Sequence, residues 1–109
     1  MLANLLGSVN KERALVYLAA RDRGYARQVA RFFNAPLSPV QNALDKLESA
    51  GVLISRAVGS TREYEFNPRY PARAELATLL NRALSLYPHA LRDQLLLARS
   101  RPRRKGKPL

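Results

Sequence analysis

The segment from Ser38 to Phe66 constrains the fold most, because its hydrophobic period changes from helical to strand-like within one short stretch. The first part predicts a helix with Ser38 as N-cap, Pro39 at the first helical position and Gln41 completing a capping box. Gly51 is expected to stop this helix. A strand-like pattern follows without a linker, so the helix should pack beside a small sheet.

Two strand-like runs surround the turn sequence "GSTR". Residues 52–58 are expected to form the first strand, with Val52, Ile54 and Val58 on one side. After the turn, "EYEF" alternates polar and aromatic residues, as a half-buried strand does. The two runs therefore predict a β-hairpin.

Two helices are expected before this segment. One runs from residue 10 to about residue 21, with Ser8 as its cap and Gly24 as a C′ residue. The next is "YARQVARFFNA", in which Arg27 and Arg31 lie off the apolar face. About four residues join it to the helix that begins near Ser38, a spacing typical of a helix-turn-helix.

The C-terminal part predicts two more helices. Apolar residues recur at helical spacing from residue 72 to 86, Pro88 breaks the pattern, and "HALRDQLLLARS" predicts a second, shorter helix. We expect a DNA-binding domain over residues 1–70, a helical dimerisation segment over 71–98 and a disordered basic tail over 99–109. The broad leucine surface of the two helices favours a homodimer, with packing inside one chain as the alternative.

Charge indicates the kind of partner. The 109 residues include 19 basic and eight acidic side chains, a net charge of +11. Six basic residues and no acidic ones lie in residues 99–109, so the remaining 98 residues still have a net charge of +5. This balance favours a polyanionic partner, although charge alone does not separate DNA from RNA or an anionic membrane.

Several classes of protein do not fit the sequence. The absence of cysteine excludes disulfides and thiolate metal sites, and fits a reducing, cytoplasmic location. A lone histidine, His89, does not make a metal site. We found no catalytic set and no phosphate-binding glycine loop, so neither an enzyme nor a cofactor is expected. No stretch has the length of a membrane span.

The helix-turn-helix and the hairpin together suggest a surface for duplex DNA. The second helix of such a motif enters the major groove, and a hairpin "wing" can contact the backbone or the minor groove. The candidate contacts are Ser38, Pro39, Gln41, Asn42 and Lys46 on the helix, Arg56, Ser60, Thr61 and Arg62 on the wing, and Arg27 and Arg31 on the preceding helix. Gln and Asn can each bond adenine through two groups.

The acidic residues Asp45 and Glu48 on the same helix argue against this surface, because carboxylates repel phosphate. They could instead accept from cytosine or pair with neighbouring Arg or Lys side chains.

The segments "ARQVARFFNAPLSPVQNALDKLESAGVLISR" and "GSTREYEFNP" resemble the winged helix-turn-helix of ArsR-like and MarR-like bacterial transcriptional regulators. The resemblance covers Leu5 to about Leu80. It implies a mainly α-helical fold with a small β-hairpin and C-terminal dimerisation helices, and a dimeric repressor or activator that binds DNA. It also implies that the five helix candidates named above belong to the recognition helix, and Ser60, Thr61 and Arg62 to the wing. The absence of cysteine departs from the metal-sensing ArsR-like members.

Two other functions remain open from the sequence. A winged helix can serve as an interaction module that joins a larger assembly through its leucine-rich helices. It can also act as an architectural DNA-binding protein with little base preference.

Overall fold

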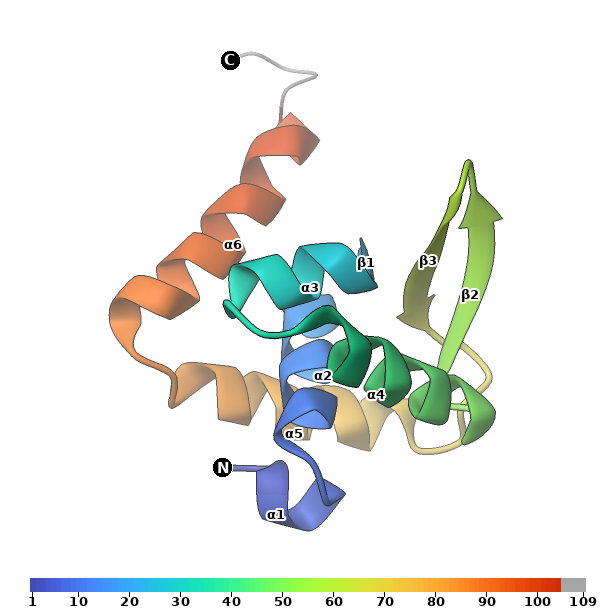
Figure 1. Cartoon of the computed structure of the whole chain (residues 1–109). Coiled ribbons are helices and arrows are strands. Elements are labelled where there is room, and N and C mark those ends of the chain that lie inside the picture. The colour runs from blue at the N-terminus through green and yellow to red at the C-terminus, as the bar shows by residue number, and fades with distance from the viewer. Residues whose placement is uncertain (105–109) are drawn as a thin grey trace.

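The computed structural model describes the backbone of residues 1–104 and the side chains of residues 1–96. Its elements, in chain order (Figure 1), are α1 (Ala3–Leu6), α2 (Val9–Arg21), β1 (Arg23–Tyr25), α3 (Ala26–Phe32), α4 (Leu37–Ser49), β2 (Leu53–Val58), β3 (Thr61–Phe66), α5 (Arg73–Ser85) and α6 (His89–Arg104). The mainly helical fold with a small hairpin is confirmed.

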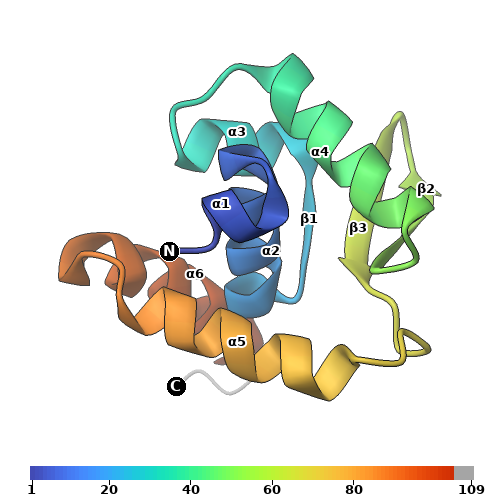
Figure 2. The same cartoon turned by 90° about the horizontal axis from the view of Figure 1, so that it is seen from below.

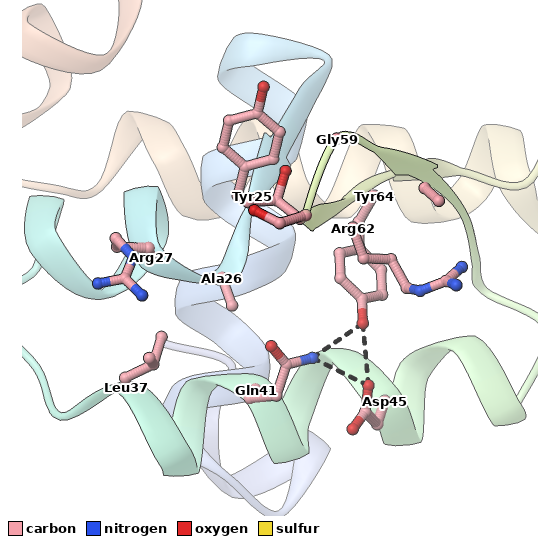
Figure 3. A pocket seen from close by; sticks show the side chains of 12 residues that line it. Tyr25, Ala26, Arg27, Leu37, Gln41, Asp45, Gly59, Arg62 and Tyr64 are labelled. Atoms are coloured by element: carbon pink, nitrogen blue, oxygen red, sulfur yellow. Dashed lines mark hydrogen bonds between the residues drawn. The ribbon is translucent and has the colours of Figure 1, made fainter.

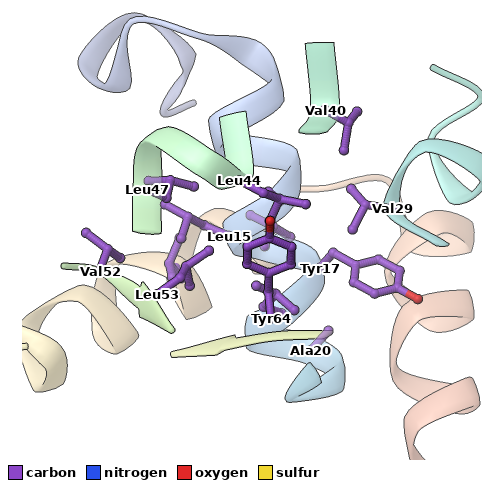
Figure 4. Close-up of a cluster of buried hydrophobic side chains, with 14 of the residues drawn as sticks. Leu15, Tyr17, Ala20, Val29, Val40, Leu44, Leu47, Val52, Leu53 and Tyr64 are labelled. Carbon is purple, nitrogen blue, oxygen red and sulfur yellow. The ribbon is translucent and has the colours of Figure 1, made fainter. Parts of the chain in front are cut away.

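Helix α2 forms the centre of the core, because its side chains are buried on almost every face. The stripe predicted on α4, Val40, Leu44 and Leu47, is confirmed and packs in the same cluster. Figure 4 shows this stripe beside Leu15 of α2 and Tyr64 of β3. The core therefore fixes which face of α4 points inward and leaves the opposite face exposed.

The start of α2 is confirmed and the start of α4 differs from the prediction. Ser8 caps α2, and its Oγ accepts from the backbone N–H groups of Asn10 and Lys11 at 3.1 and 3.2 Å. In α4 the N-cap is Pro36, so the predicted cap and capping box at Ser38 are wrong. Pro39 is tolerated because the N–H groups of the first helical turn have no partner within the helix.

The sheet contains a third strand that the sequence did not predict. Its order is β1-β3-β2, with both pairs antiparallel. Gly24 is a buried residue of β1 opposite Tyr64, so its predicted role as a helix C′ residue is wrong. A Cβ atom on Gly24 would lie 2.8 Å from Cε1 of Tyr17, which explains why glycine suits this position. Helix α2 ends at Arg21, and its C-cap is Asp22, which has φ 74°.

The side of β2 on which Ile54 and Val58 lie is not the side that faces the core. Leu53 is buried, whereas Ile54 and Val58 are each 38 % exposed. The pairing places Leu53 opposite Phe66 and Ser55 opposite Tyr64, on the side that faces the core. Because Val52 is buried just before the strand begins, the alternation starts one residue later than expected.

Helices α5 and α6 both pack against α2, and Figure 2 shows α5 running below it. The guanidinium group of Arg21 holds α6 by donating to the carbonyl oxygens of Leu95 and Gln94 at 3.2 and 3.3 Å. Helix α6 has 16 residues against 13 in α5, so the prediction that it is the shorter one is wrong.

Helix α6 continues through Arg104, so the backbone is helical over the first six residues of the segment expected to be a disordered tail. Residues 105–109 lie outside the described part of the chain. Within that part, no helix combines the length and the apolar character that crossing a membrane requires.

The buried carboxylate of Glu12 joins three parts of the chain. It accepts from the backbone N–H of Leu2 at 2.8 Å and from the hydroxyl of Tyr87 at 2.9 Å, and it lies 3.5 Å from the N-terminal amine. Burial raises the pKa of Glu12, but the hydrogen bonds from Tyr87 and Leu2 and the nearby amine outweigh burial and leave this pKa lowered. The start of the chain is thereby fixed beside the α5–α6 junction.

Candidate nucleic-acid interface

Helix α4 presents a polar face to solvent, opposite its buried stripe. Ser38, Pro39, Asn42 and Lys46, four of its five predicted contacts, are exposed. Asp45 is exposed on the same face. This face can therefore approach a partner without any rearrangement of the core.

Gln41 differs from the other predicted contacts, because it is half-buried and bonded within the molecule. Its Nε2 donates to the hydroxyl oxygen of Tyr64 at 2.9 Å and to Oδ1 of Asp45 at 3.0 Å. The Tyr64 hydroxyl in turn donates to Oδ1 of Asp45 at 2.9 Å, and Figure 3 shows the resulting triangle. We call these three residues the α4–β3 triad; it fixes α4 to the sheet.

The pKa of Tyr64 is raised to about 12, first by burial and then by the hydrogen bond to Asp45, while the hydrogen bond from Gln41 opposes this rise by a smaller amount. The hydroxyl therefore stays protonated at neutral pH and can donate to Asp45. The Asp45 carboxylate accepts hydrogen bonds from Gln41 and Tyr64, which offset part of its negative charge. Its repulsion of a phosphate is therefore weaker than the sequence suggests.

The two arginines of the wing lie on opposite faces of the hairpin. Arg62 is on the inner face with Tyr64, and its Nη1 donates to Oγ of Ser55 at 3.1 Å. Arg56 is on the outer face, where its guanidinium group pairs with Oε1 of Glu63 at 3.0 Å. Both arginines flank the turn as predicted, but they do not face the same way.

A groove of about 520 Å³ separates the wing from the starts of α3 and α4. It brings together five of the predicted contacts: Arg27, Gln41, Ser60, Thr61 and Arg62 (Figure 3 labels three of them). Arg31 and Arg56 do not line this groove. Glycine suits the tip of the wing, because Gly59 has φ 64°.

A second hollow, of about 230 Å³, lies on the other side of α4. Pro39, Asn42 and Lys46 line it from α4, and Lys11 lines it from the first turn of α2. The sequence did not indicate Lys11 as a site residue. The packing of α2 against α4 brings it there, and that packing has no local signal in the chain.

Comparisons with known proteins bear on the fold. No protein-family model and no curated protein matches the chain. Among solved structures, it is similar to a MarR-family transcriptional regulator from Silicibacter pomeroyi (TM-score 0.59, 19% identity, 99% of this chain and 79% of that one). It is also similar to YusO from Bacillus subtilis (TM-score 0.56, 13% identity, 97% and 79%). A third is the adhesin competence repressor AdcR from Streptococcus pyogenes (TM-score 0.51, 14% identity, 97% and 87%).

These likenesses extend over nearly the whole chain, at identities that establish the fold. With α3 and α4 as its helix-turn-helix and β2 and β3 as its wing, the chain has the winged-helix fold of MarR-family transcriptional regulators.

Proposed function

We propose that this chain is a sequence-specific regulator of transcription that binds double-stranded DNA as a homodimer. The observation that carries the proposal is the exposed polar face of α4, with Arg27 and Arg62 on one side of the helix and Lys11 and Lys46 on the other. The fold shared with MarR-family regulators supports it, and so does the positive charge of the whole chain.

The dimensions and chemistry of α4 suit a major groove. Its 13 residues span about 20 Å, and the major groove, about 12 Å wide, admits one helix. Asn42 is exposed and can bond adenine through its amide oxygen and nitrogen. Because Gln41 is held by Tyr64 and Asp45, we assign base contact to Asn42 and a supporting role to Gln41.

An exposed apolar surface supports the homodimer. Met1, Leu5 and Val9 are exposed on and beside α1, and Leu86 is exposed at the end of α5. The Glu12 bonds hold the α5–α6 junction beside the chain start, so these side chains belong to one end of the molecule. Burying them between two copies would favour association by roughly 25 cal/mol per Å² of apolar surface.

Repression is the regulatory outcome that we propose. A dimer occupying a promoter blocks other proteins from the same duplex. One of the similar structures, AdcR, is named as a repressor. Whether the protein represses or activates is tested by measuring transcription, with and without the protein, from a promoter that carries its binding site.

Selection from a random duplex library tests the proposal directly. We expect a symmetric motif to be enriched, with half-sites about one helical turn apart. Asn42→Ala should relax preference at one base pair per half-site, by about 1–3 kcal/mol. The matched control is Asn81→Ala, which removes an exposed amide from α5 and should leave the motif unchanged. Equal effects of the two variants would contradict the assignment of α4.

The same exposed apolar end favours one alternative, an interaction module that joins a different protein. Light scattering combined with duplex titration separates the two functions. A dimer whose duplex affinity falls steeply with salt supports the regulator. A monomer without duplex affinity supports the interaction module.

A further inference from the structure

We propose that the hollow between the α1–α2 junction and α4 binds one backbone phosphate of the duplex, held jointly by Lys11 and Lys46. This inference rests on the proposed function and adds a contact from the start of α2, which lies outside the helix-turn-helix and the wing. The side chains that line the hollow come from separate elements: Ser8, Asn10 and Lys11 from the start of α2, and Pro39, Asn42, Ala43 and Lys46 from α4.

The charge of this hollow suits an anion. Among the residues whose side chains the structure describes, two lysines line it and no acidic residue does. Glu12, which follows Lys11 in sequence, is turned to other partners, since its two carboxylate oxygens bind the Leu2 amide and the Tyr87 hydroxyl. The groove on the wing side differs, because Asp45 is part of its wall.

The two lysines are distinctive in the sequence. They are the only lysines in residues 1–104, where every other permanently charged basic side chain is arginine. Lys46 lies in the last turn of α4, where a cation stabilises the helix dipole. Lys11 lies in the first turn of α2, where a cation opposes the dipole. Helix stability therefore accounts for Lys46 and gives no reason for Lys11.

Neutral donors accompany the lysines. The Oδ1 atom of Asn10 accepts from Nη1 of Arg13 at 3.3 Å, so its amide nitrogen is the group left to donate. The Oγ atom of Ser8 accepts two backbone N–H groups, and its hydroxyl hydrogen is likewise left to donate. At about 30 Å³ per water molecule, a volume of about 230 Å³ admits a phosphate group together with several waters.

The position of the hollow fits a helix lying in a groove. Figure 1 shows the wing rising on one side of α4 and α1 lying on the other. A helix in the major groove has a phosphate backbone along each side. Arg27 and Arg62 lie toward one backbone, and the lysine hollow lies where it can meet the other.

The test measures duplex affinity of the full chain against salt concentration by fluorescence anisotropy. Removing one phosphate contact should reduce the steepness of log K against log[salt] by about 0.9 per protomer. We expect part of this reduction in Lys11→Gln and in Lys46→Gln, because the remaining lysine still faces the phosphate, with all sequences weakened alike. Because both lysines bind one phosphate, the double variant should show the full reduction of about 0.9 and no more. Lys11→Arg should retain the wild-type slope.

The control is Arg82→Gln, which removes one positive charge from an exposed position on α5 and should leave the slope unchanged. Thermal unfolding of each variant verifies that the fold is intact. If wild type binds duplex but Lys11→Gln has the wild-type slope, the inference is wrong. A reduction of about 1.8 in the double variant would mean two separate phosphates and would also overturn it. A wild-type chain that binds no duplex would contradict the proposed function itself, and the inference with it.

Discussion

The two sides of α4 differ in how their polar groups are satisfied. On the wing side, Gln41, Asp45 and Tyr64 bond to one another, and the Ser55 hydroxyl donates to Glu48 at 2.7 Å. On the α1–α2 side, Lys11 and Lys46 line a hollow without an acidic neighbour in its wall. One side mainly holds the helix in place, and the other is chemically available to an anion.

This difference shows that a count of basic residues does not locate a binding surface. Arg56 and Lys11 each contribute one positive charge, but Arg56 pairs with Glu63 while Lys11 faces an acid-free hollow. What matters is whether a cation already has an acidic partner in the folded protein.

Removing the Tyr64 side chain should have the largest effect on stability. Tyr64 is 1 % exposed and joins the core to the α4–β3 triad. Tyr64→Ala leaves a cavity and should cost about 3–5 kcal/mol of unfolding free energy, as other buried aromatic deletions do. Urea denaturation measures this cost, with Asn42→Ala as the exposed control on α4. A cost below about 1 kcal/mol would mean that the wing side does not support the helix.

Alkaline pH should also lower the unfolding free energy through Tyr64, by a smaller amount. The pKa of Tyr64 is raised from 10 to about 12, so the folded state binds its proton more tightly than the unfolded state does. This contribution is complete below pH 10 and is lost as the pH rises toward 12, up to about 3 kcal/mol at 1.36 kcal/mol per pKa unit. Urea denaturation between pH 9 and 12 measures it.

Tyr64→Phe provides the control for this pH dependence, because phenylalanine keeps the ring and has no ionisable hydroxyl. Its unfolding free energy should fall less steeply above pH 10 than that of wild type. The raised pKa of Tyr87 also contributes, so some decline should remain. Identical profiles for the two proteins would show that Tyr64 does not titrate in this way.

Breaking the Arg56–Glu63 pair should have the smallest effect. The pair lies on the outer face of the wing and the Arg56 side chain is 62 % exposed, so Arg56→Gln should cost less than about 1 kcal/mol. The same variant should change the salt dependence of duplex binding less than Lys11→Gln does. If Arg56→Gln changed this salt dependence more than Lys11→Gln, the charge available to DNA would lie on the wing and not in the lysine hollow.

Local patterns made much of the fold predictable. The Val40–Leu44–Leu47 stripe follows from helical spacing, and the Ser8 cap and the turn at Gly59 follow from residue type. Strand β1 was missed, because three residues are too few to show a period and its partner β3 lies far along the chain.

The candidate site was less predictable for the same physical reason. A helical wheel correctly places Asn42 outside, but it cannot show that Tyr64, from 23 residues away, holds Gln41. No local pattern predicts that Lys11 and Lys46 line the same hollow, because this depends on how α2 packs against α4. The contacts of a side chain can be known only from the structure when its partners come from distant elements.

Titration of the ¹⁵N-labelled protein with a duplex, followed by NMR, shows residue by residue whether the exposed face of α4 binds DNA. We predict that the backbone amides of residues 37–49, together with those of Lys11 and the wing tip at Ser60, shift and saturate. Those on the outer face of α5 around Arg82 should stay unchanged. If the shifts occur only beyond residue 98, or if α4 shows none, the exposed face of α4 is not the surface that binds DNA.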